Sequence, residues 1–269
     1  MMAVVLARGA GRRMRMPDAA AGLSARQQAA ADHGAKVMMP LGEGAGRPFL
    51  DYALSALADA GCTEVCLVVP PDHDAVRAHY TPRPGSRLSV RFAVQFAPTG
   101  MAAALLAAAP VVGDRSFLVA NGDNLYPPAA IAALAALDGC GLAAFTRASL
   151  LDESGFDLAR VARFATVTAD ADGWLTEIRE KPPASEVAVA AGALVSMNLW
   201  RFDPAIFAAC RAVALSPRGE YELPDAVSLA MAGGMRVRVM ATGGAVLDLT
   251  NRSDIAAVSR RLALVTARL

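Results

Sequence analysis

The chain has 269 residues, a formal net charge of +1 and a composition that is 55% hydrophobic. This length supports a large core in one large domain or two small ones. The nearly neutral charge argues against a general nucleic-acid surface, which needs an excess of basic residues. No apolar run approaches the ~20 residues of a membrane span, and the amino terminus leads directly into a strand and a basic loop rather than a signal peptide. We therefore expect a cytoplasmic protein that binds neither nucleic acid nor a membrane.

The cysteines support this expectation. All four have apolar neighbours and lack the paired spacing of metal-binding motifs; they are Cys62, Cys66, Cys140 and Cys210. Such residues are predicted to be buried free thiols.

A short apolar strand at residues 3–7 is followed by a loop, 8–15, that contains two glycines and four arginines. Glycine lets backbone N–H groups approach a ligand closely, and successive N–H groups form a concavity suited to phosphate oxygens. Arginine adds forked donors that match phosphate geometry. The loop is neither a dinucleotide fingerprint, because Met14 stands where the third glycine would be, nor a Walker loop. Taken alone, it fits a polyphosphate site or a solvated basic turn.

Strands are predicted to alternate with helices over roughly the first 145 residues, the pattern of parallel βαβ units in a doubly wound sheet. The strands are expected at residues 3–7, 65–69, 88–96 and 117–120, and the helices after Ser24, from Leu50 to Gly61, from about Asp72 and after Gly100. In such sheets ligands bind at the carboxyl ends of the strands. The loops 8–15, 95–100 and 121–124 are all expected at that edge.

The second half has a different pattern. Residues 164–168 and 174–179 are predicted to form a hairpin around a turn at 170–173. Asp170 and Asp172 also fit the Asp-x-Asp metal motif of glycosyltransferases, but Asp-Gly turn chemistry explains them better. Further strands are expected at 191–202, 236–241 and 246–248, and helices from Pro204 and from about Ser253. The apolar stretch 129–137 fits either a core helix or an interface of a homo-oligomer, so the oligomeric state stays open.

Six stretches, in order along the chain, resemble motifs of the sugar-1-phosphate nucleotidylyltransferases, which make nucleotide sugars. Residues 6–14 resemble the signature Leu-Ala-x-Gly-x-Gly-x-Arg-Met/Leu, and 47–50 the segment Lys-Pro-Met/Leu-Ile/Leu. Residues 95–102 resemble the segment that reads the base, and 122–124 the Gly-Asp-Asn that holds the metal. Residues 180–182 match Glu-Lys-Pro, and 246–250 are similar to Trp-x-Asp-Ile-Gly. The resemblance implies a Rossmann-like, doubly wound α/β fold with a mixed, mostly parallel sheet.

The resemblance further implies one catalytic domain over 1–269, with a nucleotide-binding half (1–145) and a sugar-phosphate-binding half (146–269). The reaction would join a nucleoside triphosphate to a sugar-1-phosphate, with Mg²⁺ as cofactor and loss of pyrophosphate. Arg13 would neutralise the phosphates, Lys36 would approach the α-phosphate, and Asp123 and Asp248 would hold the metal. The nucleotide would be bound by Leu6, Ala7, Arg8, Gly9, Ala10, Gly11, Gln95 and Gly100, and the sugar phosphate by Glu180, Lys181, Ser196 and Asn198.

Several positions depart from the family pattern. Arg8 replaces a small residue, and Lys36 follows Arg13 by 23 positions, about twice the usual separation. Asn198 stands where some members have glycine, and Val246 replaces the tryptophan. Two other functions therefore remain open: a non-catalytic sensor of nucleotide sugars, and a nucleotidyltransferase that acts on a non-sugar phosphate. The sequence does not specify the base or the sugar.

Overall fold

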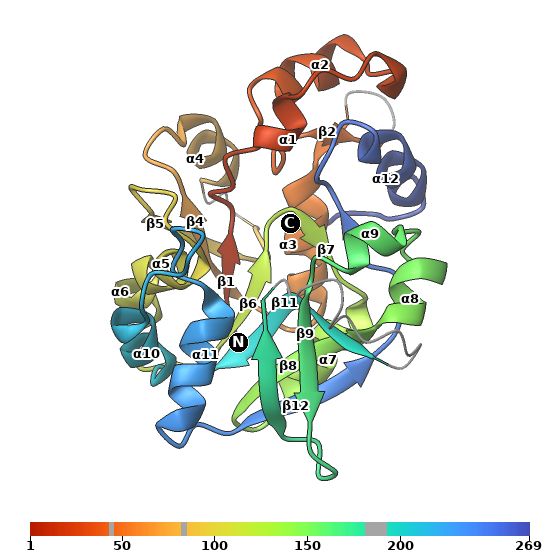
Figure 1. The fold of residues 1–269 in the computed structure, drawn as a ribbon. Helices are drawn as coiled ribbons and strands as arrows, with labels where there is room; N and C mark the ends of the chain where they lie inside the picture. Colours follow the sequence, from red (N-terminus) through yellow and green to blue (C-terminus); the bar gives the residue numbers. More distant parts are fainter. Residues whose placement is uncertain (43–45, 82–84, 181–192) are drawn as a thin grey trace.

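The computed structural model describes residues 1–42, 46–81, 85–180 and 193–269, and its central element is a nine-stranded mixed sheet (Figure 1). Strand β1 (Met2–Leu6) lies between β4 (Glu64–Val69) and β6 (Phe117–Asn121), and both pairings are parallel. Strand β5 (Ser89–Val94) adds to β4, also in parallel. The predicted doubly wound, parallel half of the sheet is confirmed.

The long strand β11 (Leu194–Phe202) turns the parallel sheet into a mixed one, because it runs antiparallel to β6, β8 and β9. The other strands of this half are β8 (Cys140–Thr146), β9 (Ala165–Ala169), β10 (Leu175–Arg179) and β12 (Val237–Thr242). The β9–β10 hairpin is confirmed. Asp170 accepts hydrogen bonds from the backbone N–H groups of Asp172 (3.0 Å) and Trp174 (2.8 Å), so its carboxylate closes the turn.

Helices cover both faces of the sheet. This cover is needed because successive side chains of β1 point to opposite faces and are buried on both. Ala3 and Val5 belong to the core under α3 (Phe49–Asp59) and α7 (Pro128–Ala136). Met2 and Val4 belong to the opposite core, which is covered by helices α5, α10 and α11. These helices span Met101–Ala107, Ile206–Ala212 and Leu223–Ala232; α4 (Asp74–Tyr80) and α6 (Ala109–Val112) flank the parallel strands. The four cysteines are buried free thiols, as predicted.

The residues between Arg13 and Lys36 fold into a small layer above the sheet (Figure 1). It contains α1 (Arg12–Arg15), a 3₁₀ turn (Ala19–Ala21) and α2 (Ala25–Asp32), which begins at the predicted Ser24 with a capping box to Gln27. This layer packs with β2 (Pro40–Leu41), β3 (Arg47–Pro48) and the C-terminal helix α12 (Asp254–Leu262) around a third apolar cluster. The insertion is therefore tied to the end of the chain.

Two short strands, β7 (Asn124–Leu125) and β13 (Leu247–Asp248), pair antiparallel. Their pairing brings the segment after β6 next to a segment near the end of the chain. Residues 147–161, which no sequence pattern assigned, contain α8 (Arg147–Asp152) and α9 (Leu158–Val161). Within the described ranges, no helix has the length and apolar character needed to cross a membrane.

Candidate active site

A cavity of about 1110 Å³ lies at the carboxyl ends of β1, β5 and β6, where the sequence placed it. It is large enough for a nucleotide with a second substrate. Its lining contains eleven of the residues selected from the sequence: Leu6, Ala7, Arg8, Gly9, Ala10, Gly11, Arg13, Lys36, Gln95, Gly100 and Asp123. These residues come from four separate segments, so the fold gathers them into one place.

The loop of residues 8–15, the expected phosphate loop, is held in shape by a contact between two glycines. Gly11 has a φ of +60°, and a Cβ at this position would lie 2.3 Å from the carbonyl oxygen of Gly34. Only glycine combines this left-handed conformation with so close an approach. The loop and the end of the insertion therefore touch directly, and Arg12, Arg13 and Arg15 line the cavity beside this contact.

At the other end of the cavity, Arg8 and Gln95 organise the segment that follows β5. Arg8 donates from Nε to the Gln95 carbonyl and from Nη2 to the Phe96 carbonyl, both at 3.2 Å. The buried Gln95 amide donates from Nε2 to the Gly100 carbonyl at 3.0 Å. Gly100 has a φ of +114° and lies against the backbone of Tyr221. Arg8 thus braces the segment expected to read the base, and one Gln95 N–H is used within the protein.

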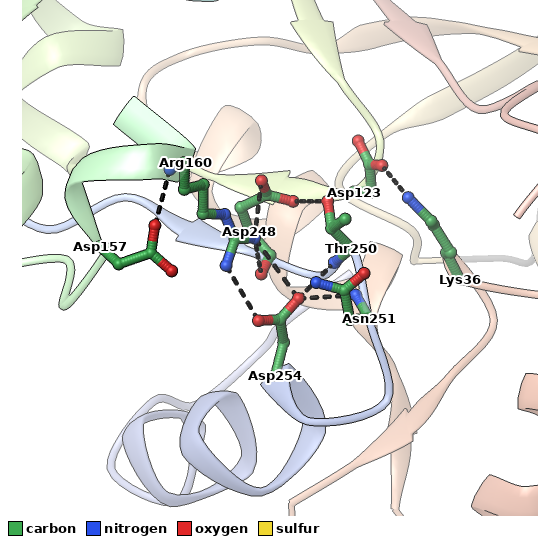
Figure 2. Close-up of polar contacts among 8 residues, drawn as sticks. All are labelled: Lys36, Asp123, Asp157, Arg160, Asp248, Thr250, Asn251 and Asp254. Atoms are coloured by element: carbon green, nitrogen blue, oxygen red, sulfur yellow. Dashed lines mark hydrogen bonds and ion pairs between the residues drawn. The ribbon is translucent and has the colours of Figure 1, made fainter. Parts of the chain in front are cut away.

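Asp123 lies next to Lys36 in the cavity. Lys36 Nζ donates to Asp123 Oδ2 at 3.0 Å, although the two residues are 87 positions apart (Figure 2). Asp123 is brought here by Gly122, whose N–H donates to the Leu6 carbonyl at 2.9 Å and whose Cβ would lie 3.1 Å from that oxygen. The inserted segment therefore returns Lys36 to the cavity despite the long separation from Arg13.

Asp248 lies beside Asp123 because β13 pairs with β7. Asp248 is opposite Asn124, and the Leu249 N–H donates to the Asp123 carbonyl at 3.0 Å. Burial raises the pKa of the Asp248 carboxyl and the Asp123 carboxylate raises it further, against the lowering effects of Arg160 and Thr250. A carboxylate that makes ionisation of its neighbour more costly in this way favours a cation between the two.

The donor set fits Mg²⁺, which takes oxygen ligands and is usually held by one or two carboxylates together with substrate phosphates. Asp123 and Asp248 are the two carboxylates that would hold it, and a cation, the Lys36 ammonium, lies 3.0 Å from Asp123. No larger group of three or more acidic, histidine or cysteine ligands occurs in the part of the chain that the structure describes. A metal here would depend on phosphate oxygens for its remaining ligands.

The residues expected to hold the sugar phosphate are more dispersed. Lys181 lies outside the described residues. Glu180 is 3.5 Å from Arg218, which also lies 3.9 Å from Glu220, a residue of the cavity lining. Glu180 is therefore connected to the cavity rim through Arg218.

Ser196 and Asn198 do not line the cavity. They lie at a bulge in β11, where the Asn198 N–H donates to Ser196 Oγ at 3.1 Å. Asn198 has a φ of +60°, a conformation that favours glycine and that asparagine tolerates better than most other residues. The structure gives both residues a role in shaping the strand.

Other lining residues were not selected from the sequence. The insertion contributes Ala29, Ala30, His33, Gly34 and Ala35, and the loop after β4 contributes Asp72 and His73. Neither histidine lies at a spacing from other ligand residues that would predict a role from the sequence. Arg160 contacts Asp248, 88 positions later in the chain, and no local pattern in the sequence predicts this contact. The insertion, by contrast, is indicated in the sequence by the unusually long separation of Arg13 and Lys36.

The family model for nucleotidyl transferases matches residues 2–263. The chain belongs to the nucleotidyl transferase family. It is 31% identical to a glucose-1-phosphate thymidylyltransferase from Streptomyces antibioticus over 80% of this chain and 58% of that protein. It is 29% identical to a UTP–glucose-1-phosphate uridylyltransferase from Haloferax volcanii over 81% of this chain and 84% of that one. The family membership inferred from the six motifs is confirmed.

The solved structure of a UDP-glucose pyrophosphorylase bound to UDP-glucose has a similar fold, with a TM-score of 0.74 over 97% of both chains. Its sequence identity is 16%, so this likeness concerns the fold. It confirms the expected nucleotide-diphospho-sugar transferase architecture of this nucleotidyl transferase. The match with the Streptomyces protein leaves over a third of that relative uncovered.

Proposed function

We propose that this nucleotidyl transferase joins the nucleotidylyl group of a nucleoside triphosphate to a sugar-1-phosphate, releasing pyrophosphate and forming a nucleotide sugar, with Mg²⁺ as cofactor. The observation that carries the proposal is the composition of the single cavity described above. It combines a glycine-arginine loop, a braced segment after β5 and the Lys36–Asp123 pair. A nucleotide needs donors for its phosphates, a platform for its base and a cation site, and these three features provide them.

The chain's own residues account for binding and orientation. Residues 9–11 and Arg13 line the cavity, where the backbone N–H groups and the guanidinium would hold the β- and γ-phosphates and stabilise the departing pyrophosphate. Lys36 is a point charge on a flexible stem, so it can leave Asp123 for the α-phosphate when a nucleotide enters. Asp123 and Asp248 would hold the metal. When bound, Mg²⁺ supplies charge neutralisation at the phosphate oxygens.

The acceptor's phosphate oxygen would attack the α-phosphorus in line and expel pyrophosphate, without a covalent intermediate on the protein. Catalysis of this kind relies on positioning and charge stabilisation. Glu180 and Lys181 are our candidates for holding the acceptor, and the link from Glu180 through Arg218 to Glu220, a residue of the cavity lining, supports this role for Glu180.

The test is pyrophosphate release in the presence of Mg²⁺. Each of dTTP, UTP, ATP, CTP and GTP is paired with a panel of sugar-1-phosphates and with several phospho-alcohols. We expect turnover with at least one sugar-1-phosphate and little with the phospho-alcohols. Turnover with phospho-alcohols alone would assign a non-sugar acceptor. Binding of nucleotide sugars by thermal shift, with no turnover in any pairing, would refute catalysis and favour a sensor.

A further inference from the structure

Arg160 is held firmly beside the Asp123–Asp248 carboxylate pair. It lies in α9, where the Asp157 side chain accepts a hydrogen bond from the Arg160 backbone N–H at 2.6 Å. Its guanidinium carbon lies 4.4 Å from the centre of the Phe156 ring, a cation–π contact. The side chain is 14% exposed. These contacts fix the position of the positive charge.

The guanidinium fork of Arg160 joins Asp248 to the start of α12 (Figure 2). Nη2 lies 2.9 Å from Asp248 Oδ2 and donates to the Asp248 carbonyl at 3.3 Å, while Nη1 lies 2.9 Å from Asp254 Oδ1. The Thr250 hydroxyl donates to Asp248 Oδ1 at 2.8 Å. Both oxygens of the Asp248 carboxylate therefore already have donors.

Each carboxylate of the Asp123–Asp248 pair already faces a cation, although Arg160 also serves Asp254. Asp248 faces Arg160, and Asp123 faces Lys36 at 3.0 Å. A divalent ion that arrives alone must compete with a cation at each carboxylate, which weakens its net attraction to the pair. Lys36 can swing toward a phosphate, whereas Arg160 is anchored by Asp254 and Phe156 and stays in place. The phosphate oxygens of a nucleotide would bring further negative charge to the ion.

We propose that Arg160 is a built-in counter-cation that keeps free divalent ions from binding the Asp123–Asp248 pair until a nucleotide brings the metal with its phosphates. The inference rests on the proposed function for the identity of the ligand. Arg160 acts through Asp248 and is a positioning residue. It would make metal binding depend on nucleotide binding, so that the empty site does not fill with metal alone.

The test is direct titration of the nucleotide-free protein with Mn²⁺, followed by electron paramagnetic resonance of the unbound ion. Arg160→Gln keeps a donor but loses the charge, and we expect it to bind Mn²⁺ about tenfold more tightly than the wild type. Arg160→Lys keeps the charge and should bind as weakly as the wild type. Arg160→Met, which retains an apolar stem over Phe156, is a second uncharged variant in case Arg160→Gln does not fold. Arg261→Met is the matched control, because Arg261 contacts the Ser154 carbonyl nearby and not Asp248.

The gained binding must belong to this site, so it should disappear when Asp248→Asn is added to Arg160→Gln. Equal or weaker Mn²⁺ binding by the uncharged variants would overturn the proposal. So would tight binding to the nucleotide-free wild type that Asp248→Asn removes. The titration requires no turnover. If no pyrophosphate is released with any substrate pair but Arg160→Gln binds Mn²⁺ more tightly than the wild type, the proposed function is refuted. The proposal that Arg160 acts as a counter-cation would still hold.

Discussion

Gly11→Ala tests whether the phosphate loop depends on its contact with the insertion. The new Cβ would lie 2.3 Å from the Gly34 carbonyl oxygen and 2.6 Å from Gly34 Cα, about 1 Å closer than ordinary van der Waals contact. The left-handed conformation adds about 1–2 kcal/mol for any residue with a Cβ. The loop must therefore shift by about 1 Å, and a misplacement of this size can reduce catalysis by about 10²-fold.

The matched control is Gly22→Ala. Gly22 has nearly the same φ, +58°, but no atom lies within 4 Å of its Cβ position, so the variant carries the strain without the overlap. Gly22→Ala should lose about 1–2 kcal/mol in the free energy of unfolding, measured with urea, and Gly11→Ala should lose more because of the added overlap. Only Gly11→Ala should lower kcat/KM in the pyrophosphate assay by about 10²-fold. Equal activity in the two variants would refute the reasoning, because the overlap with Gly34 would then have no effect on the site.

Further predictions concern the rest of the molecule. Arg252→Met should lower the free energy of unfolding by about 3 kcal/mol, measured with urea. The reason is that the buried guanidinium donates to the Met14 carbonyl at 2.9 Å and to the Arg15 carbonyl at 3.3 Å. A loss below about 1 kcal/mol would contradict this. Tyr126→Phe should cost about 1–2 kcal/mol, since the buried hydroxyl donates to the Met197 carbonyl at 2.8 Å, and an unchanged melting temperature would argue against that bond. Burial raises the pKa of Cys66 to about 12, so this thiol should resist alkylation at pH 8 until the protein unfolds. Below about pH 8.5 the Cys66 thiol is protonated in both the folded and the unfolded protein, so it does not change the free energy of unfolding with pH. Above that pH the thiol ionises in the unfolded protein first, so the folded protein should become less stable as the pH rises.

The sequence predicted the parallel half of the sheet well because its signals are local. Residues 3–7 form a short apolar run that is followed by a glycine-containing loop. In the structure Ala3 and Val5 pack in the core on one face of the sheet, and Met2 and Val4 pack in the core on the other face. Asp123 follows a buried strand at the edge where parallel sheets bind ligands. Strand order and loop position are therefore enough to predict that the residues expected to bind the nucleotide lie together at one cavity.

The other half of the site depends on contacts that have no local signal. Arg160 meets Asp248 across 88 positions, and α9 is too short for a hydrophobic period. Asn198 matches a binding motif in the sequence, yet in the structure its positive φ serves a strand bulge. The insertion was recognised by its length, but its packing on α12 depends on tertiary contacts such as those of Arg252 with α1.

The most direct test of the central claim is pyrophosphate release by Asp123→Asn, with the substrate pair that the wild type uses and saturating Mg²⁺. The account predicts a rate at least about 10²-fold below the wild type, because the carboxylate nearest Lys36 and the cavity would no longer hold the cation. Asp59→Asn, which changes an exposed partner of Arg87, should retain the wild-type rate. If Asp123→Asn releases pyrophosphate as fast as Asp59→Asn, this cavity is not where the chemistry takes place.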